Sequence, residues 1–365
     1  MIGVLGASGA VGRHAVQALR EAGYGPLRLG ARRTERLSTA DGEVVAVDVT
    51  DARSVAAFCT GLRVVLNCAG PTYALQERMA SAALAAGAHY VDVGGDDPVH
   101  EKLTAAEAVR GGARVVLSAG TLPGLSALVP RWLAGRWPGA GRLVCHAGGV
   151  ERCTETVAAD FMLSLTVGGA EGEPFGVPLA AWRHGRRVPR ALRVVEDAEV
   201  PYFPDRATLQ PILTAEAERL AATLDLTELD NYNVHPGPRV RALFARLPTL
   251  GLDDPGARAA AISRLITAAE VDLAGRRPYY RMVFTLDGPE GPRTAVVSTP
   301  SSYRLTAVTG VLAVRAVLDG AVPPGLHFGG EVLDPGWVVD EINRGGAAEI
   351  RVPGHDDEAY EEGTL

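Results

Sequence analysis

The sequence predicts an α/β protein with an N-terminal doubly wound parallel sheet and an inserted α+β domain. Three observations carry this prediction. Short apolar runs alternate with helical patterns over the first 120 residues, the alternation stops near Gly120, and a long apolar helical pattern follows at Leu305–Leu318. Strand–helix alternation with short links is typical of βαβ units, whose right-handed crossovers wind helices onto both faces of one sheet.

In this first part, six short apolar runs are expected to be strands and four Ala-rich stretches are expected to be helices. The expected strands are Ile2–Leu5, Leu27–Gly30, Val44–Val47, Val64–Asn67, Tyr90–Val93 and Val115–Ser118. The expected helices are Val11–Ala22, Ala52–Thr60, Leu75–Ala86 and Leu103–Val109. Because most successive strands are joined by such a helix, the strands are expected to run parallel.

Beyond Gly120 the pattern changes to longer strands, irregular loops and a few well-defined helices. The Gly-, Pro- and Arg-rich stretch 168–211 is expected to form long loops with short strands, and Asp287–Pro292 is expected to turn a β-hairpin. The other expected elements are helices at Leu128–Leu133, Ala215–Leu224 and Ala257–Leu273, a strand at Arg142–His146, a strand or helix at Phe161–Val167, and hairpin arms at Arg281–Leu286 and Thr294–Ser298.

Composition and charge exclude several classes of protein before any motif is considered. The formal net charge of −7 does not suit nucleic acid or an anionic membrane as the main partner. Of the 36 basic residues, Lys102 alone is a lysine. It follows His100-Glu101, so no G-x-x-x-x-G-K-[ST] phosphate loop can form. The Tyr-x-x-x-Lys dyad of short-chain dehydrogenases is excluded as well, because position 98 is Pro98.

The chain is expected to be cytoplasmic. Its first residues enter a strand pattern at once, without a basic region, a long apolar core or a cleavage site. No run of about 18 apolar residues is present, so no membrane span is expected. The four cysteines lack C-x-x-C spacing and are expected to be reduced thiols. Cys145 and His146 are adjacent and would point to opposite faces of a strand, so no metal site is expected.

A glycine-rich turn between the first strand and the first helix carries the most specific motif. It reads Gly6-Ala7-Ser8-Gly9-Ala10-Val11-Gly12, a G-x-x-G-x-x-G variant. The first glycine permits a tight turn, the second lets a pyrophosphate approach, and the third lets the helix pack closely on the strand. The helix N-terminus offers free N–H donors. The motif therefore predicts a Rossmann-type dinucleotide site, against the alternative of a turn that binds nothing, with binding residues Gly6, Ser8, Gly9, Ala10, Val11 and Gly12.

The end of the second strand indicates which dinucleotide binds. Arg32 and Arg33 follow this strand, and no carboxylate that could hold a ribose 2′-hydroxyl occurs before Glu35. Guanidinium groups at this place suit a 2′-phosphate, so NADP(H) is the expected cofactor. The alternative is that both arginines are solvated charges of a loop.

Two further loops at strand ends are expected to contact the cofactor. Asp48 and Val49 end the third strand, where such domains often contact the adenine edge; alternatively, Asp48 is a helix N-cap. The loop after the fourth strand consists of small residues and leaves room for ribose and nicotinamide at the edge of the sheet where ligands lie. Its expected binding residues are Asn67, Cys68, Ala69 and Gly70.

Together these motifs resemble those of the saccharopine dehydrogenase-like reductases. The resemblance rests on the glycine turn, Ala31–Arg33, the loop 67–71, Tyr90–Asp96, and Tyr303–Ala307 with the long helix behind it. It implies an NAD(P)H-dependent homodimer that acts on carbon–nitrogen bonds. The implied division is a dinucleotide-binding domain over 1–122, a substrate and dimerisation domain over 123–302, a C-terminal helix returning to the first domain over 303–345, and a tail over 346–365.

The sequence departs from the family in two places where substrate would sit. Gly95-Asp96 stands where Gly-Glu is usual, and 118–124 lacks the common Phe-Asp-Ser-Val-Pro reading. The expected function is NADPH-dependent reduction of a C=N bond in a small or carrier-tethered substrate. Reductases of thiazolinyl imines in siderophore assembly belong to this class, and a tethered substrate would bring transient contact with a nonribosomal peptide synthetase. The alternatives are a trans-acting enoyl (C=C) reductase and a non-catalytic NADP(H)-binding regulatory or scaffold protein.

Reduction of C=N needs a proton at nitrogen besides the hydride from the cofactor. Tyr73 follows the loop expected to border the nicotinamide. Asp96 and His100 lie four residues apart and would face each other if a helix starts near Pro98, with the carboxylate orienting the imidazole. These three are the expected catalytic residues, each with a structural role as its alternative. His146 is a further candidate from across the cleft, and Lys102 is the weakest.

Overall fold

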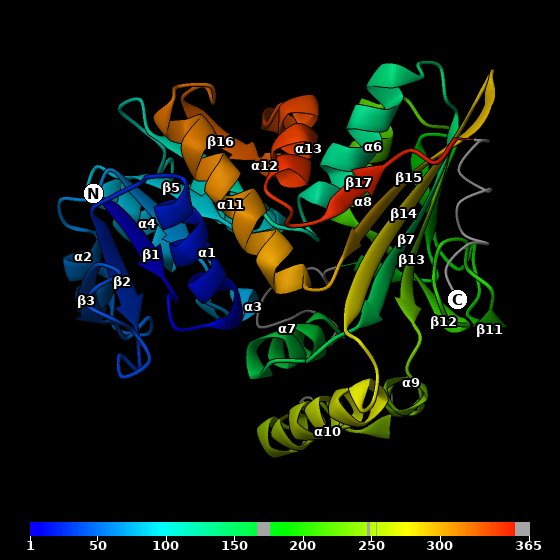
Figure 1. Cartoon of the computed structure of the whole chain (residues 1–365), viewed down its shortest axis with the longest axis horizontal. Helices are drawn as coiled ribbons and strands as arrows, with labels where there is room; N and C mark the ends of the chain where they lie inside the picture. The colour runs from blue at the N-terminus through cyan, green and yellow to red at the C-terminus, as the bar shows by residue number, and fades with distance from the viewer. Residues whose placement is uncertain (166–175, 247–248, 253, 355–365) are drawn as a thin grey trace.

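The structure is a computed structural model that describes residues 1–165, 176–246, 249–252 and 254–354. Two sheets lie on opposite sides of a layer of helices that includes α11 and α13 (Figure 1). One sheet has seven parallel strands, and the other is a mixed sheet of ten strands. The predicted fold class, a doubly wound parallel sheet with a second α+β domain, is confirmed.

The seven-stranded sheet has the order β16-β6-β5-β4-β1-β2-β3, and every neighbouring pair is parallel. Because the strands are parallel, their carboxyl ends share one edge, and the order reverses beside β1. The six predicted strands are present to within one residue at each end. The strands are β1 (Ile2–Leu5), β2 (Leu27–Ala31), β3 (Glu43–Ala46), β4 (Val64–Asn67), β5 (His89–Asp92), β6 (Arg114–Leu117) and β16 (Gly325–Phe328).

The helices of this domain differ from expectation at two places. The expected helix Leu75–Ala86 is two helices, because Gln76 adopts a φ of +50° between them. The expected helix Leu103–Val109 begins at Asp97 instead, with Pro98 in its first turn, a position that suits proline. The helices are α1 (Ala10–Glu21), α2 (Ala52–Cys59), α3 (Thr72–Leu75), α4 (Arg78–Ala85) and α5 (Asp97–Ala105).

The mixed sheet contains the predicted hairpin, whose arms meet at Gly288 and Gly291. Short strands occupy much of the expected loop region, of which 168–175 lies outside the described residues. The expected tail includes one strand that joins the edge of this sheet beside the hairpin. The strands are β7 (Arg142–Val150), β8 (Gly176–Pro178), β9 (Ala181–Arg183), β10 (Arg186–Val188), β11 (Val195–Ala198), β12 (Ala207–Thr214), β13 (Glu228–His235), β14 (Tyr279–Gly288), β15 (Gly291–Thr299) and β17 (Glu349–Arg351).

Helices cover the inner face of this sheet, where Leu143, Cys145 and Phe284 are fully buried. The segment near Phe161 is helical rather than a strand. Among the described residues, none of the helices is both long and apolar enough to cross a bilayer. The helices are α6 (Leu125–Arg136), α7 (Glu155–Leu165), α8 (Ala215–Thr223), α9 (Pro238–Phe244), α10 (Pro255–Leu273), α11 (Ser302–Leu318), α12 (Gly329–Val332) and α13 (Pro335–Arg344).

Helix α11 ties the end of the chain to the first sheet. It packs along α1 and against β4 and β5, as its position in Figure 1 shows. A Cβ at Gly310 would lie 2.7 Å from Val93 Cγ1, so a glycine here permits this close packing. The chain then adds β16 beside β6. The first sheet is therefore completed by residues that follow β7 to β15 of the mixed sheet.

Candidate functional site

The glycine-rich turn lies at the carboxyl edge of the first sheet, where β1 meets α1. Gly6 has a φ of +77°, and a Cβ there would lie 2.7 Å from the backbone N of Ala69. A Cβ on Gly12 would lie 2.1 Å from the Gly6 carbonyl oxygen, so only glycine allows α1 to pack this closely. Ala7 N and Gly6 N donate to the Gly30 carbonyl at 3.0 and 2.9 Å, which fixes the turn to β2.

The N-terminus of α1 is free to bind an anion. Its N-cap, Gly9, makes no side-chain cap, and the first turn carries no acidic residue. The first N–H groups of a helix lack intrahelical partners, and the helix dipole favours negative charge there. This is the arrangement that holds a pyrophosphate. The structure thus brings together the predicted binding residues Gly6, Ser8, Gly9, Ala10, Val11 and Gly12.

Arg32 and Arg33 directly follow β2, beside the glycine turn. Both side chains are exposed, and no ion pair joins either of them to a carboxylate in the described part of the chain. Arg28, in β2 itself, is by contrast paired with Glu43 at 2.9 Å. Two unpaired guanidinium groups at this edge fit the 2′-phosphate of NADP(H) and leave a bare 2′-hydroxyl without a carboxylate partner.

Asp48 lies near Arg32 in the loop after β3. Its Oδ1 accepts hydrogen bonds from Thr50 N and Thr50 Oγ1 at 2.9 and 2.7 Å. These bonds, and to a smaller degree the charge of Arg32, lower the pKa of Asp48. The N-cap of α2 is Asp51 and not Asp48, so the N-cap alternative for Asp48 is wrong. Val49 follows it and packs, half-buried, against the first domain's core.

The loop after β4 runs beside the glycine turn. Cys68 N donates to the Leu5 carbonyl at 2.9 Å, and Asn67 Oδ1 accepts from Ala69 N at 3.1 Å. Burial and the charge of Asp92 raise the pKa of the Cys68 thiol, so it stays a neutral thiol. The expected residues Asn67, Cys68, Ala69 and Gly70 therefore line the junction of β1 and β4, where the strand order reverses.

A buried carboxylate that we did not predict as a site residue lies next to this loop. Asp92 accepts hydrogen bonds from the Tyr90 hydroxyl at 2.6 Å, from Asn67 Nδ2 at 2.9 Å and from Gly94 N at 2.9 Å. Burial raises the pKa of Asp92, and these bonds act against that rise. The spacing of Tyr90 and Asp92, two apart on one strand face, was the signal in the sequence.

The expected catalytic residues occupy different surroundings. Tyr73 is in α3, and its side chain lies outside the described residues. Asp96 is the N-cap of α5 and accepts a hydrogen bond from Ser118 Oγ at 3.4 Å. His100 stacks on the Phe328 ring with a centroid distance of 4.8 Å. We expected the Asp96 carboxylate to orient the His100 ring; in the structure the ring stacks on an aromatic residue of β16 instead.

The two weaker candidates, His146 and Lys102, contact side chains outside the glycine turn. His146 alternates with the core residues Cys145 and Ala147 on β7, so it points to the opposite face of the mixed sheet and stacks on Tyr232 at 5.2 Å. The expectation that it reaches across the cleft is wrong. Burial lowers the pKa of His146 to about 4. Lys102 Nζ donates to the Gln76 amide between α3 and α4.

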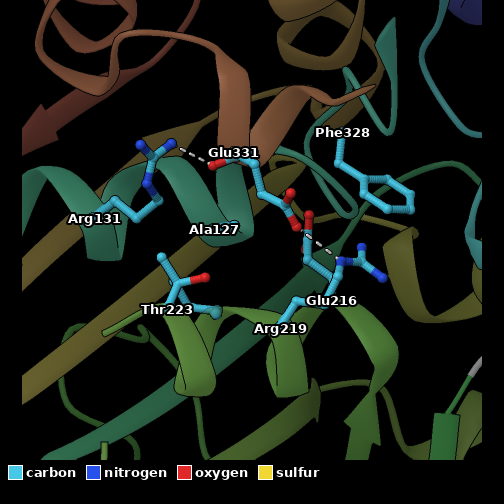
Figure 2. Close-up of a pocket in the computed structure, with 9 residues that line it drawn as sticks. Ala127, Arg131, Glu216, Arg219, Thr223, Phe328 and Glu331 are labelled. Carbon is cyan, nitrogen blue, oxygen red and sulfur yellow. Dashed lines mark hydrogen bonds and ion pairs between the residues drawn. The ribbon is translucent and has the colours of Figure 1, made fainter. Parts of the chain in front are cut away.

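A polar pocket lies where the two domains meet, on the far side of β6. Figure 2 shows Arg131 and Arg219 reaching it from α6 and α8, with Glu331 between them. Arg219 pairs with Glu331 at 3.0 Å, and its guanidinium carbon lies 3.7 Å from the Phe328 ring centroid. The half-buried Glu216 accepts a hydrogen bond from Gly124 N at 2.7 Å. Because the pocket has room for about one water molecule only, we interpret it as the interface between the domains (the seam) and not as a ligand site.

A second joint connects the mixed sheet to α11. Glu151, just beyond β7, accepts hydrogen bonds from the backbone N and the hydroxyl of Ser302, the first residue of α11. Burial raises the pKa of Glu151, and the Ser302 bonds act against that rise. Burial and Glu151 also raise the pKa of Tyr280 on β14. Nothing local in the sequence marks this cluster, because Glu151 and Ser302 are far apart along the chain.

Comparison with known proteins agrees with this geometry. Residues 6–120 match the family model of NAD(P)H-binding domains. No curated protein matches the chain significantly. Apo saccharopine dehydrogenase (L-Glu forming) from Saccharomyces cerevisiae aligns with a TM-score of 0.67 at 12% identity, over 97% of this chain and 99% of that one. An NADPH-dependent quinone oxidoreductase from Escherichia coli aligns at 18% identity over 75% of this chain and 90% of its own, but its TM-score of 0.29 carries no weight.

Residues 6–120 thus form a domain similar to NAD(P)H-binding domains, with the glycine turn at the carboxyl edge of its sheet. More particularly, nearly the whole chain has the fold of saccharopine dehydrogenase.

Proposed function

We propose that this chain is an NADPH-dependent reductase of a C=N bond, with a thiazolinyl imine of siderophore biosynthesis as the first substrate to test. One observation carries the proposal. The dinucleotide turn, the open N-terminus of α1 and the small-residue loop after β4 stand together at one edge of a chain with the saccharopine dehydrogenase fold. The two unpaired arginines after β2 support NADPH over NADH.

NADPH would supply the hydride, and the chain's own residues bind, orient and protonate. The backbone N–H groups of α1 would hold the pyrophosphate, and Arg32 and Arg33 would hold the 2′-phosphate. The proton for the imine nitrogen is assigned to one of Tyr73, Asp96 and His100. Of these, Asp96 lies at the carboxyl edge of the sheet, where its carboxylate accepts from Ser118 just after β6.

The reaction is tested with the purified chain, NADPH, and a panel of acceptors followed at the NADPH absorbance. The panel contains 2-aryl-thiazolines and cyclic imines on one side and enoyl thioesters on the other. We expect oxidation of NADPH with the C=N compounds only. Turnover confined to enoyl thioesters would replace the proposal with an enoyl reductase. Tight NADPH binding without turnover of either set would favour a regulatory or scaffold protein.

The proton donor is tested with Tyr73→Phe, Asp96→Asn and His100→Ala. The variant that removes the donor should lower kcat by about 10²–10⁴-fold and leave the Kd of NADPH unchanged. Arg63→Ala is the matched control, because Arg63 is exposed at the amino end of β4, on the opposite edge of the sheet. Full kcat in all three variants would assign the proton to water.

The cofactor preference is tested with the double variant Arg32→Ala/Arg33→Ala. Two charge-assisted bonds to a phosphate, at roughly 1.5 kcal/mol each, predict a Kd for NADPH about 100-fold higher. The Kd for NADH should change by less than about threefold, because NADH lacks the phosphate. Equal losses for both cofactors would show that the arginines are solvated charges.

The partners follow from the same proposal. We propose a homodimer that binds its imine either free or on a carrier domain of a nonribosomal peptide synthetase. Sedimentation of the purified chain tests the first part, with a monomer at micromolar concentration as the contrary result. Faster turnover of a carrier-bound thiazoline than of the free compound supports the second part, and equal rates argue against it.

A further inference from the structure

Asp92 is a buried carboxylate with three hydrogen-bond donors and, among the residues that the structure describes, no cationic partner. Its residue is 4% exposed. The groups that act on its pKa, besides burial, are the donors Tyr90, Asn67 and Gly94, and no guanidinium, ammonium or imidazole is among them. Hydrogen bonds stabilise a carboxylate removed from water, but they do not neutralise its charge. All three partners donate to the carboxylate oxygens, which favours the ionised form of Asp92 against the effect of burial.

One side chain connects this carboxylate to the cofactor edge. Asn67 donates its Nδ2 to Asp92 at 2.9 Å and accepts Ala69 N on its Oδ1 at 3.1 Å, which fixes the orientation of the amide. Ala69 N is also the atom that a Cβ at Gly6 would approach to 2.7 Å. Asp92 is therefore separated from the dinucleotide turn by one side chain and one loop residue.

The charge of Asp92 acts on this loop. It contributes, after burial, to the raised pKa of the Cys68 thiol. In dinucleotide domains of this topology, the pyrophosphate lies at the N-terminus of the first helix and the ligand crosses the point where the strand order reverses. A bound nicotinamide half would therefore lie on the side of β4 and β5, whose carboxyl ends carry Asn67 and Asp92.

The two redox states of nicotinamide differ in charge. The oxidised ring is a cation and the reduced ring is neutral, so a fixed negative charge nearby favours the oxidised form. In a buried setting such an interaction is much stronger than in water. We propose that Asp92 sets the redox preference of this site, so that NADP⁺ binds more tightly relative to NADPH than it would with a neutral residue at position 92.

This preference assists hydride donation. When the C4–H bond of the reduced ring breaks, the hydride takes both electrons to the acceptor carbon, and the ring is left with a positive charge. The acceptor's second atom takes its proton from a protein acid or from water. The inference rests on the cofactor part of the proposed function and is independent of the substrate, so it is tested by binding alone.

The test is isothermal titration of NADP⁺ and NADPH into the full chain and into Asp92→Asn. We expect the ratio Kd(NADP⁺)/Kd(NADPH) to rise about tenfold in the variant. For a two-electron couple, that factor corresponds to about 30 mV in the potential of the bound cofactor. An equal change in both Kd values, or a ratio within about twofold of the original, would overturn the proposal and leave Asp92 a structural residue.

Two control variants separate charge from folding. Tyr90→Phe keeps the carboxylate and removes one donor, so the ratio should stay within about twofold. Asp272→Asn neutralises a carboxylate that is 7% exposed and accepts from Val240 N at 2.9 Å at the start of α9, so it should lower stability without changing the ratio.

If Asp92→Asn does not fold, Asp92→Ser serves in its place, with space for a water to take up the donors. If the protein prefers NAD(H), the same ratio of Kd values is measured with NAD⁺ and NADH. Failure to reduce any imine while the ratio shifts would reject the proposed substrate and keep this inference. Normal imine turnover with an unshifted ratio would reject this inference and keep the proposed substrate.

Discussion

Replacing His146 with phenylalanine should make the protein more resistant to acid. His146 is half-buried and stacks on Tyr232, and burial lowers its pKa from 6.5 to about 4. A folded-state pKa below that of the unfolded chain gives stability that is present above pH 6.5 and is lost as the pH falls, because only the unfolded chain binds the proton. His146→Phe keeps a flat ring on Tyr232 and removes this titration.

The expected size follows from the linkage relation. Each pH unit below 6.5 costs about 1.36 kcal/mol for one proton, so the 1.5 units down to pH 5 cost roughly 2 kcal/mol. Urea unfolding followed by tryptophan fluorescence at pH 7 and pH 5 measures this loss. We expect the wild-type chain to lose about 2 kcal/mol more than His146→Phe across that interval.

Tyr232→Phe is the control, because it keeps the stacked ring pair and leaves the histidine in place. It should lose stability with pH as the wild-type chain does. A difference below about 0.5 kcal/mol between the wild type and His146→Phe would mean that the histidine is solvated when folded. That result would refute the position of His146 described above, stacked on Tyr232 and shielded from water on the outer face of the mixed sheet.

Two further substitutions test the turn and the seam. Gly12→Ala places a Cβ 2.1 Å from the Gly6 carbonyl oxygen, so it should displace α1 and raise the Kd of NADPH, measured by titration, at least tenfold. Gly135→Ala is the control: a Cβ at this position of α6 would meet no atom within 4 Å, so this variant should bind NADPH normally. Glu216→Ala leaves Gly124 N and its neighbouring donors without their acceptor, so it should lower the free energy of unfolding by about 1–3 kcal/mol, measured by urea unfolding at pH 7. An unchanged urea midpoint would show that this hydrogen bond does not stabilise the fold.

The first domain could be predicted from the sequence because its signals are local. Each buried strand is a short apolar run, and the glycine turn needs residues within seven positions of one another. The placement of Arg32 and Arg33 at the carboxyl edge follows from the end of β2 alone. The start of α5 was missed because the apolar period begins only at Leu103, whereas Pro98 sets the first turn.

Apart from the bonds of Asp92 within and beside β5, the missed contacts join distant parts of the chain. Glu216 binds Gly124 across 92 positions, and Glu151 binds Ser302 across 151. His100 pairs with Phe328, a residue of the last parallel strand, instead of the carboxylate four positions before it. A helical spacing shows which side chains can meet, but tertiary packing decides which of them do.

The late arrival of β16 has a consequence for synthesis. Residues 1–122 leave the ribosome long before Gly325–Phe328, and until then β6 has an unpaired edge and α1 lacks its cover from α11. An open strand edge is a template for pairing with another chain. The first sheet therefore stays incomplete until β7 to β15 of the mixed sheet have been made, and a nascent chain must protect the open edge of β6 during that time.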